Sequence, residues 1–315
     1  MKILLLDSLH PVFKKIVEEN GFELVDGTTW DRKTVTNRVN EFTGLAIRSR
    51  FSIDEEIISH SINLKFIARA GSGMENIDVV YARSKNIICI NSPEGNRDAV
   101  GEHAVGMLLS LLNNLNRSDN QLRNGIWQRT ENRGTELSGK TIGIIGFGNT
   151  GSAFAIKLSG FDVKILAFDK YITIETEKFP FVLQAGIEKI FEEADILSLH
   201  IPLTKETEFM INEGFLNRFK KNIYLVNTSR GKIVQTESLV KLLASGKIKG
   251  ACLDVFEFEE GSFENIKTQT TAAWEYLTKS DKVILSPHIA GWTHESNEKI
   301  ASVLANKIIS LKLKQ

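Results

Sequence analysis

The sequence predicts an α/β protein of two domains, each built on a doubly wound parallel sheet. Short apolar runs alternate with helical stretches along almost the whole chain, which is the pattern of repeated βαβ units. The chain has 315 residues, and a single hydrophobic core seldom serves more than about 250–300, so two domains are expected. A glycine-rich turn between an apolar strand and a helix is typical of doubly wound sheets.

The first domain is predicted within residues 1–97. Its apolar runs are short enough for buried strands, and helical stretches such as residues 11–20 and 53–61 separate them. The predicted strands are residues 3–6, 45–47, 66–68 and 87–90. These elements make a complete small α/β domain.

A long helix and a second series of strands follow, in a domain predicted over residues 98–285. Residues 98–116 are apolar for longer than a strand requires and predict a buried helix with Asp98 as its N-cap. Residues 298–315 keep apolar side chains at helical spacing and predict a packed final helix. The strands of this domain are predicted at residues 141–145, 163–168, 196–199, 224–226, 250–253 and 283–285.

The composition excludes several classes of partner. The 39 Lys and Arg residues balance 39 Asp and Glu residues, so the chain has no basic excess for nucleic acid or an anionic membrane. No apolar run approaches the roughly 20 residues of a membrane span, and the run at residues 1–7 is too short for a signal peptide. Cys89 and Cys252 lie in apolar runs without metal-ligand spacing, so we expect buried packing residues, no metal and a cytoplasmic protein.

A dinucleotide site is predicted at the glycine-rich turn. Gly146, Gly148 and Gly151 form GxGxxG between the apolar strand and a helical stretch, where the backbone can approach a pyrophosphate. Asp169 ends the next strand, 21 residues after Gly148, at the offset of an acid that binds the adenosine ribose. An acid there repels a ribose phosphate, so NAD is predicted over NADP, although Lys170 leaves some NADP use open.

Three polar residues, Arg230, Asp254 and His288, each follow an apolar strand in the second domain, where open α/β sheets bind ligands. Oxidation of a hydroxy acid by NAD needs a group that holds the carboxylate and one that takes the hydroxyl proton. A guanidinium suits the first task and an imidazole the second. The residues alone leave open that His288 is a surface imidazole and that Arg230 pairs with a surface acid.

The chain resembles the D-isomer-specific 2-hydroxyacid dehydrogenases over nearly its whole length. The resemblance rests on LSGKTIGIIGFG, NTSRG, LDVF and SPH, which begin at residues 137, 227, 253 and 286. It implies that Arg230 binds the substrate carboxylate and carbonyl while His288, paired with Glu259, moves the proton. Glu257 and Glu260 lie close enough to leave the choice of Glu259 open. A carboxylate beside an imidazole favours its charged form, so this pair would keep both protonation states accessible.

The same resemblance implies the domain closure and the remaining site residues. Residues 286–315 would complete the first domain, giving flavodoxin-like and Rossmann-like domains with a cleft between them. The NAD site would comprise Gly146, Gly148, Asn149, Thr150, Gly151, Asp169, His200, Ile201, Pro202, Thr228, Ser229, Asp254, His288 and Gly291. The substrate site would comprise Arg48, Arg69, Gly71, Ser72, Gly73, Arg230 and His288.

Arg48 and Arg69 resemble the 3-phosphoglycerate dehydrogenase branch of the family, where two arginines face the substrate phosphate. A dianionic phosphate favours such guanidinium donors. We therefore expect NAD-dependent oxidation of D-3-phosphoglycerate to 3-phosphohydroxypyruvate for serine synthesis. Only 27 residues follow His288, so we expect a short form without a regulatory domain.

Further expectations concern assembly and substrate size. Residues 127–137 resemble a segment at the subunit contact of that branch, which implies a homodimer through the NAD-binding domain, with Arg129 or Arg133 lent to the partner's site. The stretch at 261–282 and Trp292 depart from the family pattern near His288 and leave the substrate size open. The alternatives are a hydroxypyruvate or glyoxylate reductase, a D-lactate dehydrogenase, an NAD-sensing corepressor and a silent NAD-binding protein.

Overall fold

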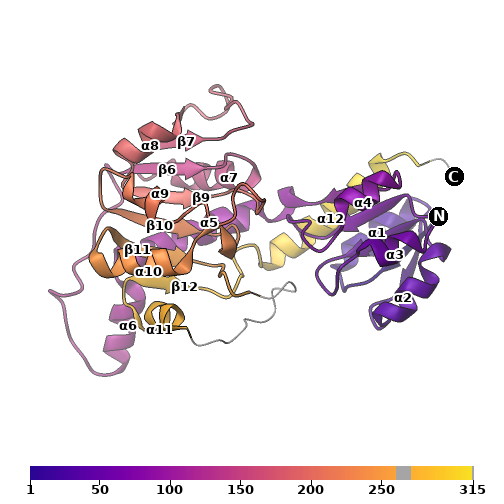
Figure 1. The fold of residues 1–315 in the computed structure, drawn as a ribbon, viewed down its shortest axis with the longest axis horizontal. Coiled ribbons are helices and arrows are strands. Elements are labelled where there is room, and N and C mark those ends of the chain that lie inside the picture. Colours follow the sequence, from indigo (N-terminus) through magenta and orange to yellow (C-terminus); the bar gives the residue numbers. More distant parts are fainter. Residues whose placement is uncertain (260–270, 314–315) are drawn as a thin grey trace. The chain divides into compact units, whose positions relative to one another are not determined.

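The computed structural model describes residues 1–259 and 271–313, and its contacts divide them into two compact units. Unit 1 comprises Met1–Arg97 and residues 292–313, and unit 2 comprises Asp98–Glu259 and residues 271–291. Each unit contains one sheet whose strands are all parallel (Figure 1). The predicted α/β class with two parallel sheets is confirmed.

The sheet of unit 1 has five strands in the order β2-β1-β3-β4-β5, the order of flavodoxin-like sheets. They are β1 (Lys2–Leu5), β2 (Glu23–Asp26), β3 (Gly44–Ile47), β4 (Phe66–Arg69) and β5 (Ile88–Asn91). Every residue of β3 and β4 is buried because helices cover both faces of the sheet. Four strands match the predicted ones, and the missed strand β2 is a half-exposed edge strand without an apolar run.

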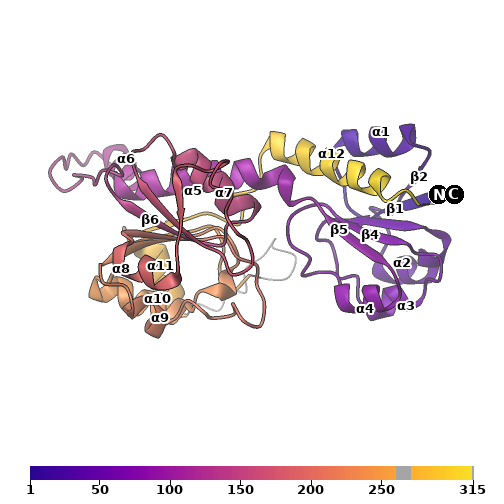
Figure 2. The same cartoon turned by 90° about the horizontal axis from the view of Figure 1, so that it is seen from above.

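The helices of unit 1 lie on the two faces of this sheet, as Figure 2 shows. On one face α1 (Pro11–Glu19) packs beside α12 (His294–Ser310), whose Ala301, Leu304 and Ile308 are buried against the sheet. The other face is covered by α2 (Arg32–Arg38), the 3-10 turn η1 (Val39–Glu41), α3 (Glu55–Ser59) and α4 (Val79–Ser84). The last helix of the chain therefore completes the core of the first unit.

The sheet of unit 2 has seven strands in the order β12-β11-β10-β9-β6-β7-β8. The chain starts in the middle, runs to one edge and returns to build the other half, so the strand order reverses between β6 and β9 as in Rossmann sheets. The strands are β6 (Thr141–Ile145), β7 (Lys164–Phe168), β8 (Val182–Gln184), β9 (Ile196–Leu199), β10 (Ile223–Asn227), β11 (Ile248–Leu253) and β12 (Val283–Leu285). Only the short, half-exposed edge strand β8 was absent from the prediction.

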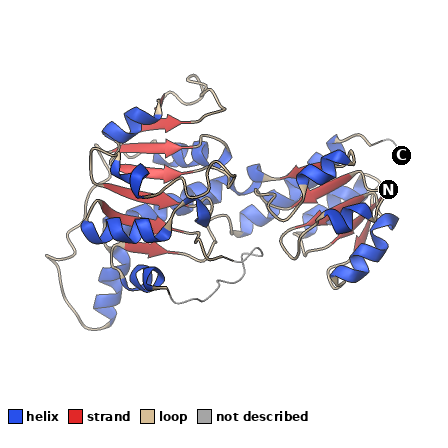
Figure 3. Ribbon diagram, viewed as in Figure 1, coloured by secondary structure: helices blue, strands red, loops and turns tan. Residues whose placement is uncertain are grey.

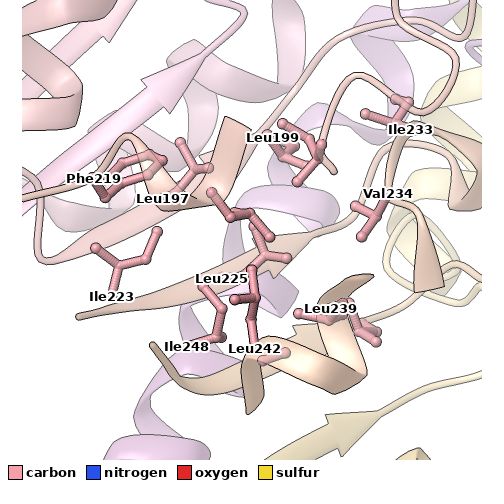
Figure 4. Packing of buried hydrophobic residues seen from close by; sticks show 14 of the residues in the cluster. Leu197, Leu199, Phe219, Ile223, Leu225, Ile233, Val234, Leu239, Leu242 and Ile248 are labelled. Atoms are coloured by element: carbon pink, nitrogen blue, oxygen red, sulfur yellow. The ribbon is translucent and has the colours of Figure 1, made fainter. Parts of the chain in front are cut away.

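Helices also cover both faces of the second sheet (Figure 3). On one face lie α5 (Pro93–Leu112) and α7 (Asn149–Leu158). On the other, Leu239 and Leu242 of α10 (Thr236–Ser245) pack on β9, β10 and β11, as Figure 4 shows. The remaining elements are α6 (Leu115–Arg123), α8 (Ile187–Glu193), α9 (Glu213–Asn217), the 3-10 turn η2 (Gly231–Ile233), α10 (Thr236–Ser245) and α11 (Ala272–Lys279).

Several details differ from the sequence-based expectations. Helix α5 begins at Pro93 rather than at Asp98, because proline suits the first turn of a helix. Contacts assign residues 286–291 to unit 2, whereas the sequence-based division placed residues 286–315 in the first domain. Cys252 is buried, which raises the pKa of its thiol, but Cys89 is only half-buried. Within the described residues, no helix is long and apolar enough to span a membrane, and no His, Cys, Asp and Glu cluster could hold a metal.

Candidate active site

The turn after β6 contains three glycines, and their structural surroundings differ. Gly146 has a φ of +90°, and a Cβ there would lie 2.3 Å from the carbonyl oxygen of His200. A Cβ on Gly151 would lie 2.1 Å from the carbonyl oxygen of Gly146, so α7 packs directly on the turn. At Gly148 a Cβ would meet no atom within 4 Å in the described part of the chain. The protein's own packing requires the outer two glycines, whereas the middle one borders open space that a ligand can enter.

The amino end of α7 faces this turn and fits an anion. Its N-cap is Gly148, and no side chain of the described residues caps the helix. The first N–H groups of a helix have no partners within it and carry its positive dipole end. These features fit a pyrophosphate, as the GxGxxG pattern predicts.

Asp169 is fixed beside the glycine turn. Its Oδ2 accepts the N–H of Phe147 at 2.7 Å, and its Oδ1 accepts the N–H groups of Tyr171 and Ile172 at 2.8 and 3.0 Å. Carboxylate oxygens have further lone pairs, so the group can also accept ribose hydroxyls. Lys170, the residue that left some use of NADP open, forms an ion pair with Glu206. Its Nζ lies 2.5 Å from Glu206 Oε1.

Two buried polar groups border the same edge of the sheet. His200, which follows β9, contacts Ser198 Oγ through Nε2 at 2.9 Å and Thr150 Oγ1 through Nδ1 at 3.3 Å. Burial lowers the pKa of His200 to about 3, so the ring is neutral near pH 7. The buried hydroxyl of Thr228 finds no hydrogen-bond partner among the described residues, as fits a group whose partner is a bound cofactor. Ile201 is half-buried and Pro202 exposed beside them.

The low pKa of His200 predicts a pH-dependent stability. The unfolded chain, with a histidine pKa near 6.5, binds one more proton than the folded chain between about pH 6.5 and 3. His200 therefore contributes stability that is present above pH 6.5 and is lost by about 1.4 kcal/mol per pH unit as the pH falls. Urea unfolding at pH 7, 6 and 5 should show a flatter dependence for His200→Asn than for the wild type.

The matched control is His60→Asn, because His60 is exposed on the surface of unit 1. This variant should lose stability with pH as the wild type does. Equal slopes for His200→Asn and the wild type would contradict the prediction.

Arg230 follows β10, and the buried side chains of Asn227 and Ser229 hold the backbone around it. Asn227 accepts the N–H of Ser229 at 3.0 Å and donates to the carbonyl oxygen of Arg230 at 3.1 Å. Ser229 Oγ donates to the carbonyl oxygen of Leu199 at 2.6 Å, which ties the segment to β9. The guanidinium Nη1 donates to the carbonyl oxygen of Ser229 at 2.7 Å. The arginine is thus anchored at the carboxyl end of the sheet.

His288 and Glu259 form a close pair. His288 Nδ1 lies 2.7 Å from Glu259 Oε2, and the two side chains are only 23% and 11% exposed. Glu257 instead accepts the N–H of Thr236 at 3.0 Å, and Glu260 lies outside the described residues. Of the two described glutamates, the structure therefore brings Glu259 to the histidine.

Asp254 holds the turn that carries His288. Its carboxylate is 1% exposed and accepts the Ser286 hydroxyl at 2.6 Å and the N–H groups of Ile289 and Ala290 at 2.9 and 2.8 Å. Its carbonyl oxygen accepts the N–H of His288 at 2.7 Å, and His288 has a left-handed φ of 55°. These bonds join residues 286–290 to unit 2 and explain why the contact boundary lies beyond them. Gly291 follows directly.

Sequence reasoning missed two members of this network. His103 of α5 lies with Nε2 2.9 Å from Ser286 Oγ and 3.6 Å from Asp254 Oδ1. The only sequence signal was a polar Glu102-His103 pair inside an otherwise apolar helix. Ser286 is the first residue of the SPH motif, but no role was predicted for it.

In unit 1, Asp7 holds the loop that follows β3 and contains Arg48, Ser49 and Arg50. Sequence reasoning missed Asp7 as well. Asp7 Oδ2 accepts the backbone N–H groups of Arg48, Ser49 and Arg50 at 2.6, 3.2 and 3.4 Å. Arg69 Nε donates to the carbonyl oxygen of Arg48 at 3.1 Å, so the two predicted substrate arginines are neighbours. Arg50 donates instead to backbone carbonyl oxygens of Leu6 and Gly27.

The glycine loop after β4 has a conformation that only glycine supports. Gly71 has a φ of +142°, and a Cβ there would lie 1.9 Å from Arg69 Nη1. Its N–H donates to Ser92 Oγ at 3.2 Å, while Ser72 Oγ donates to Asn96 Oδ1 at 2.7 Å. Gly73 follows, half-buried. Gly71 of the predicted loop thus lies directly against the Arg69 guanidinium in unit 1.

Comparison with known families gives a match for most of unit 2. The model of the D-isomer specific 2-hydroxyacid dehydrogenase, NAD binding domain, matches residues 105–290. This range includes the glycine turn, Asp169, Arg230 and the pair of Glu259 and His288.

Individual relatives cover nearly the whole chain. The D-3-phosphoglycerate dehydrogenase of Archaeoglobus fulgidus is 30% identical over 311 residues, 99% of this chain and 57% of that protein. A glyoxylate reductase of Thermofilum pendens is 40% identical over 265 residues, 82% of this chain and 75% of that protein. The solved D-lactate dehydrogenase of Aquifex aeolicus, in complex with NAD and lactic acid, is 29% identical with a TM-score of 0.82 and covers 99% of this chain and 95% of that one. The chain spans little more than half the length of the phosphoglycerate dehydrogenase relative.

Proposed function

Since the chain belongs to the D-isomer specific 2-hydroxyacid dehydrogenase family, whose members are NAD-dependent oxidoreductases, we propose that it oxidises D-3-phosphoglycerate to 3-phosphohydroxypyruvate in serine synthesis. The proposal assigns the chemistry to Arg230, Glu259 and His288. It assigns recognition of the substrate phosphate to Arg48 and Arg69, with backbone amides of residues 71–73.

The observation that carries the choice of substrate is the neighbouring pair Arg48 and Arg69. Arg69 is buried and donates through Nε to the carbonyl oxygen of Arg48. A phosphate dianion is a fitting ligand for guanidinium donors of this kind. Lactate and glyoxylate carry one carboxylate and no second anionic group, so they would use Arg230 alone.

The chemistry follows from the contacts of His288. NAD held at the glycine turn and Asp169 would supply the acceptor for the hydride of C2 of the hydroxy acid. With Nδ1–H donated to Glu259, Nε2 of His288 carries the lone pair that takes the hydroxyl proton, and the C2–O bond becomes a carbonyl. The imidazolium that results lies against the Glu259 carboxylate, which stabilises its charge. Arg230 holds the substrate carboxylate through paired N–H donors.

Initial rates of NADH formation with D-3-phosphoglycerate, D-glycerate and D-lactate test this proposal. We expect kcat/KM for the phosphorylated acid to exceed the others at least about tenfold, because an added charged contact contributes on the order of 1–3 kcal/mol. Higher kcat/KM for D-lactate or D-glycerate would refute the choice of substrate. In that case the 40% identity to a glyoxylate reductase favours a hydroxypyruvate or glyoxylate reductase, which the reverse reaction with NADH would measure.

For assembly and location we propose a cytoplasmic homodimer formed through unit 2. All residues of α6 are exposed or half-buried, and its Leu115 and Leu122 are exposed. Ile126 and Trp127, which follow the helix, are exposed as well. An apolar surface of this kind is typical of protein contacts. Both cysteines are free thiols, in keeping with a reducing compartment.

A further inference from the structure

An exposed tryptophan stacks on one of the two arginines of unit 1. The guanidinium carbon of Arg48 lies 3.4 Å from the centroid of the Trp292 ring. Trp292 remains 61% exposed, whereas Arg48 is half-buried. The residues are 244 positions apart in the sequence, and both belong to unit 1. A large apolar ring left in solvent therefore makes a specific contact with a charged side chain.

The backbones on both sides of this contact are fixed by other groups. Asp7 accepts the N–H of Arg48 at 2.6 Å, and the carbonyl oxygen of Arg48 accepts Arg69 Nε at 3.1 Å. Trp292 directly precedes α12, where Thr293 and Ser296 form a reciprocal capping box. Against these fixed backbones, the stacking on Trp292 restricts the orientation of the Arg48 guanidinium.

Stacking of this kind is compatible with anion binding. The ring contacts the face of the guanidinium, whereas the N–H donors lie in the guanidinium plane and point along its edges. A guanidinium held against a ring is already oriented for paired hydrogen bonds, so less conformational entropy is lost when an anion binds. A lysine could not be oriented in this way.

We propose that Trp292 is a positioning residue that holds the Arg48 guanidinium in the orientation that binds a phosphate ester on the substrate. This inference rests on the proposed function and deepens it. Trp292 is thereby a determinant of the preference for a phosphorylated over an unphosphorylated 2-hydroxy acid. It acts through Arg48 and needs no contact of its own with the substrate.

The experiment compares Trp292→Ala with Trp292→Phe, which keeps an aromatic face. We expect the alanine variant to raise KM for D-3-phosphoglycerate about threefold to fivefold with kcat changed less than about twofold, as fits loss of one partly exposed cation–π contact. The ratio of kcat/KM for D-3-phosphoglycerate to that for D-glycerate should fall by about the same factor. The phenylalanine variant should recover most of the loss. Combining Trp292→Ala with Arg48→Gln should lower the ratio no further than Arg48→Gln alone.

A direct binding measurement separates this inference from the proposed function. Calorimetry with inorganic phosphate should give a Kd raised about threefold to fivefold in Trp292→Ala and little changed in Trp292→Phe. If Trp292 served only to anchor α12, the alanine variant would have a lower Tm but wild-type phosphate affinity, which would overturn the inference. Equal losses with both acids would overturn it as well. If no 2-hydroxy acid were turned over, the proposed function would fail, and the phosphate titration would still decide the role of Trp292.

Discussion

Replacing His288 with asparagine is expected to lower kcat about a thousandfold, a much larger effect than on NADH binding. Asparagine can preserve a hydrogen bond to Glu259 but cannot take the substrate hydroxyl proton. The imidazole is the group in this pair that can accept the proton, because its Nδ1 is already engaged at 2.7 Å with Glu259 and leaves Nε2 for the substrate. Stopped-flow measurement of hydride transfer, together with a fluorescence titration of NADH, separates chemistry from binding.

The partner variant Glu259→Gln keeps the size and hydrogen-bonding capacity of the side chain but removes its charge. It should reduce kcat less than His288→Asn, by about tenfold to a hundredfold, since the imidazolium forms without a neighbouring carboxylate. The double variant should be no slower than His288→Asn, because both residues act in one step. A His288→Asn variant with more than about a tenth of the wild-type kcat would show that another group moves the proton.

Replacing Asp254 with asparagine is expected to lower both stability and activity. Three donors, the Ser286 hydroxyl and the N–H groups of Ile289 and Ala290, converge on a carboxylate that is 1% exposed. An amide oxygen can accept some of these bonds, but its NH2 group would face a donor in a buried place. The free energy of unfolding should fall by about 2–4 kcal/mol, measured by urea denaturation. Because the same turn carries His288, kcat should fall even under conditions in which the variant is folded.

Asp195→Asn is the matched control. Asp195 also accepts a backbone N–H, from Thr141 at 2.9 Å, but it precedes β9 and so lies at the amino end of the sheet, away from the candidate site. It also pairs with the exposed Lys221, and such surface contacts contribute about 1 kcal/mol or less. The control should therefore lose little stability and keep its kcat. A similar loss of kcat in both variants would contradict the anchoring role of Asp254.

Much of the fold followed from local patterns in the sequence. The buried central strands can be recognised in the sequence as apolar runs, because helices cover both faces of each strand. The edge strands β2 and β8 carry exposed residues and no such run, so local composition could not reveal them. Helix α12 was predicted from its spacing, whereas its place in the first unit came from the family resemblance.

Some residues of the candidate site could likewise be predicted from local sequence patterns, and others could not. Glycines at fixed spacing and an acid at a fixed offset predict a nucleotide site. The turn requires glycines for its backbone geometry, and the acid binds the ribose hydroxyls. Asp7, His103 and Ser286 act through contacts with residues distant in the sequence, and each is an ordinary polar residue in its local context. The stacking of Trp292 on Arg48 joins positions 244 residues apart, so sequence reasoning noted the tryptophan only as a departure from the family pattern. Long-range side-chain partners require the structure.

The position of α12 also determines when each unit can fold during synthesis. Met1–Arg97 emerges first from the ribosome, but its sheet has one face covered by Ala301, Leu304 and Ile308 of the last helix. Until that helix is made, Phe66 and Ala68 lack part of their apolar cover. Among the described residues, the seven strands of the second sheet all lie within residues 141–285, ahead of α12. We therefore expect the second unit to fold before the first on the ribosome, with the nascent first unit exposing apolar surface to chaperones until α12 has emerged.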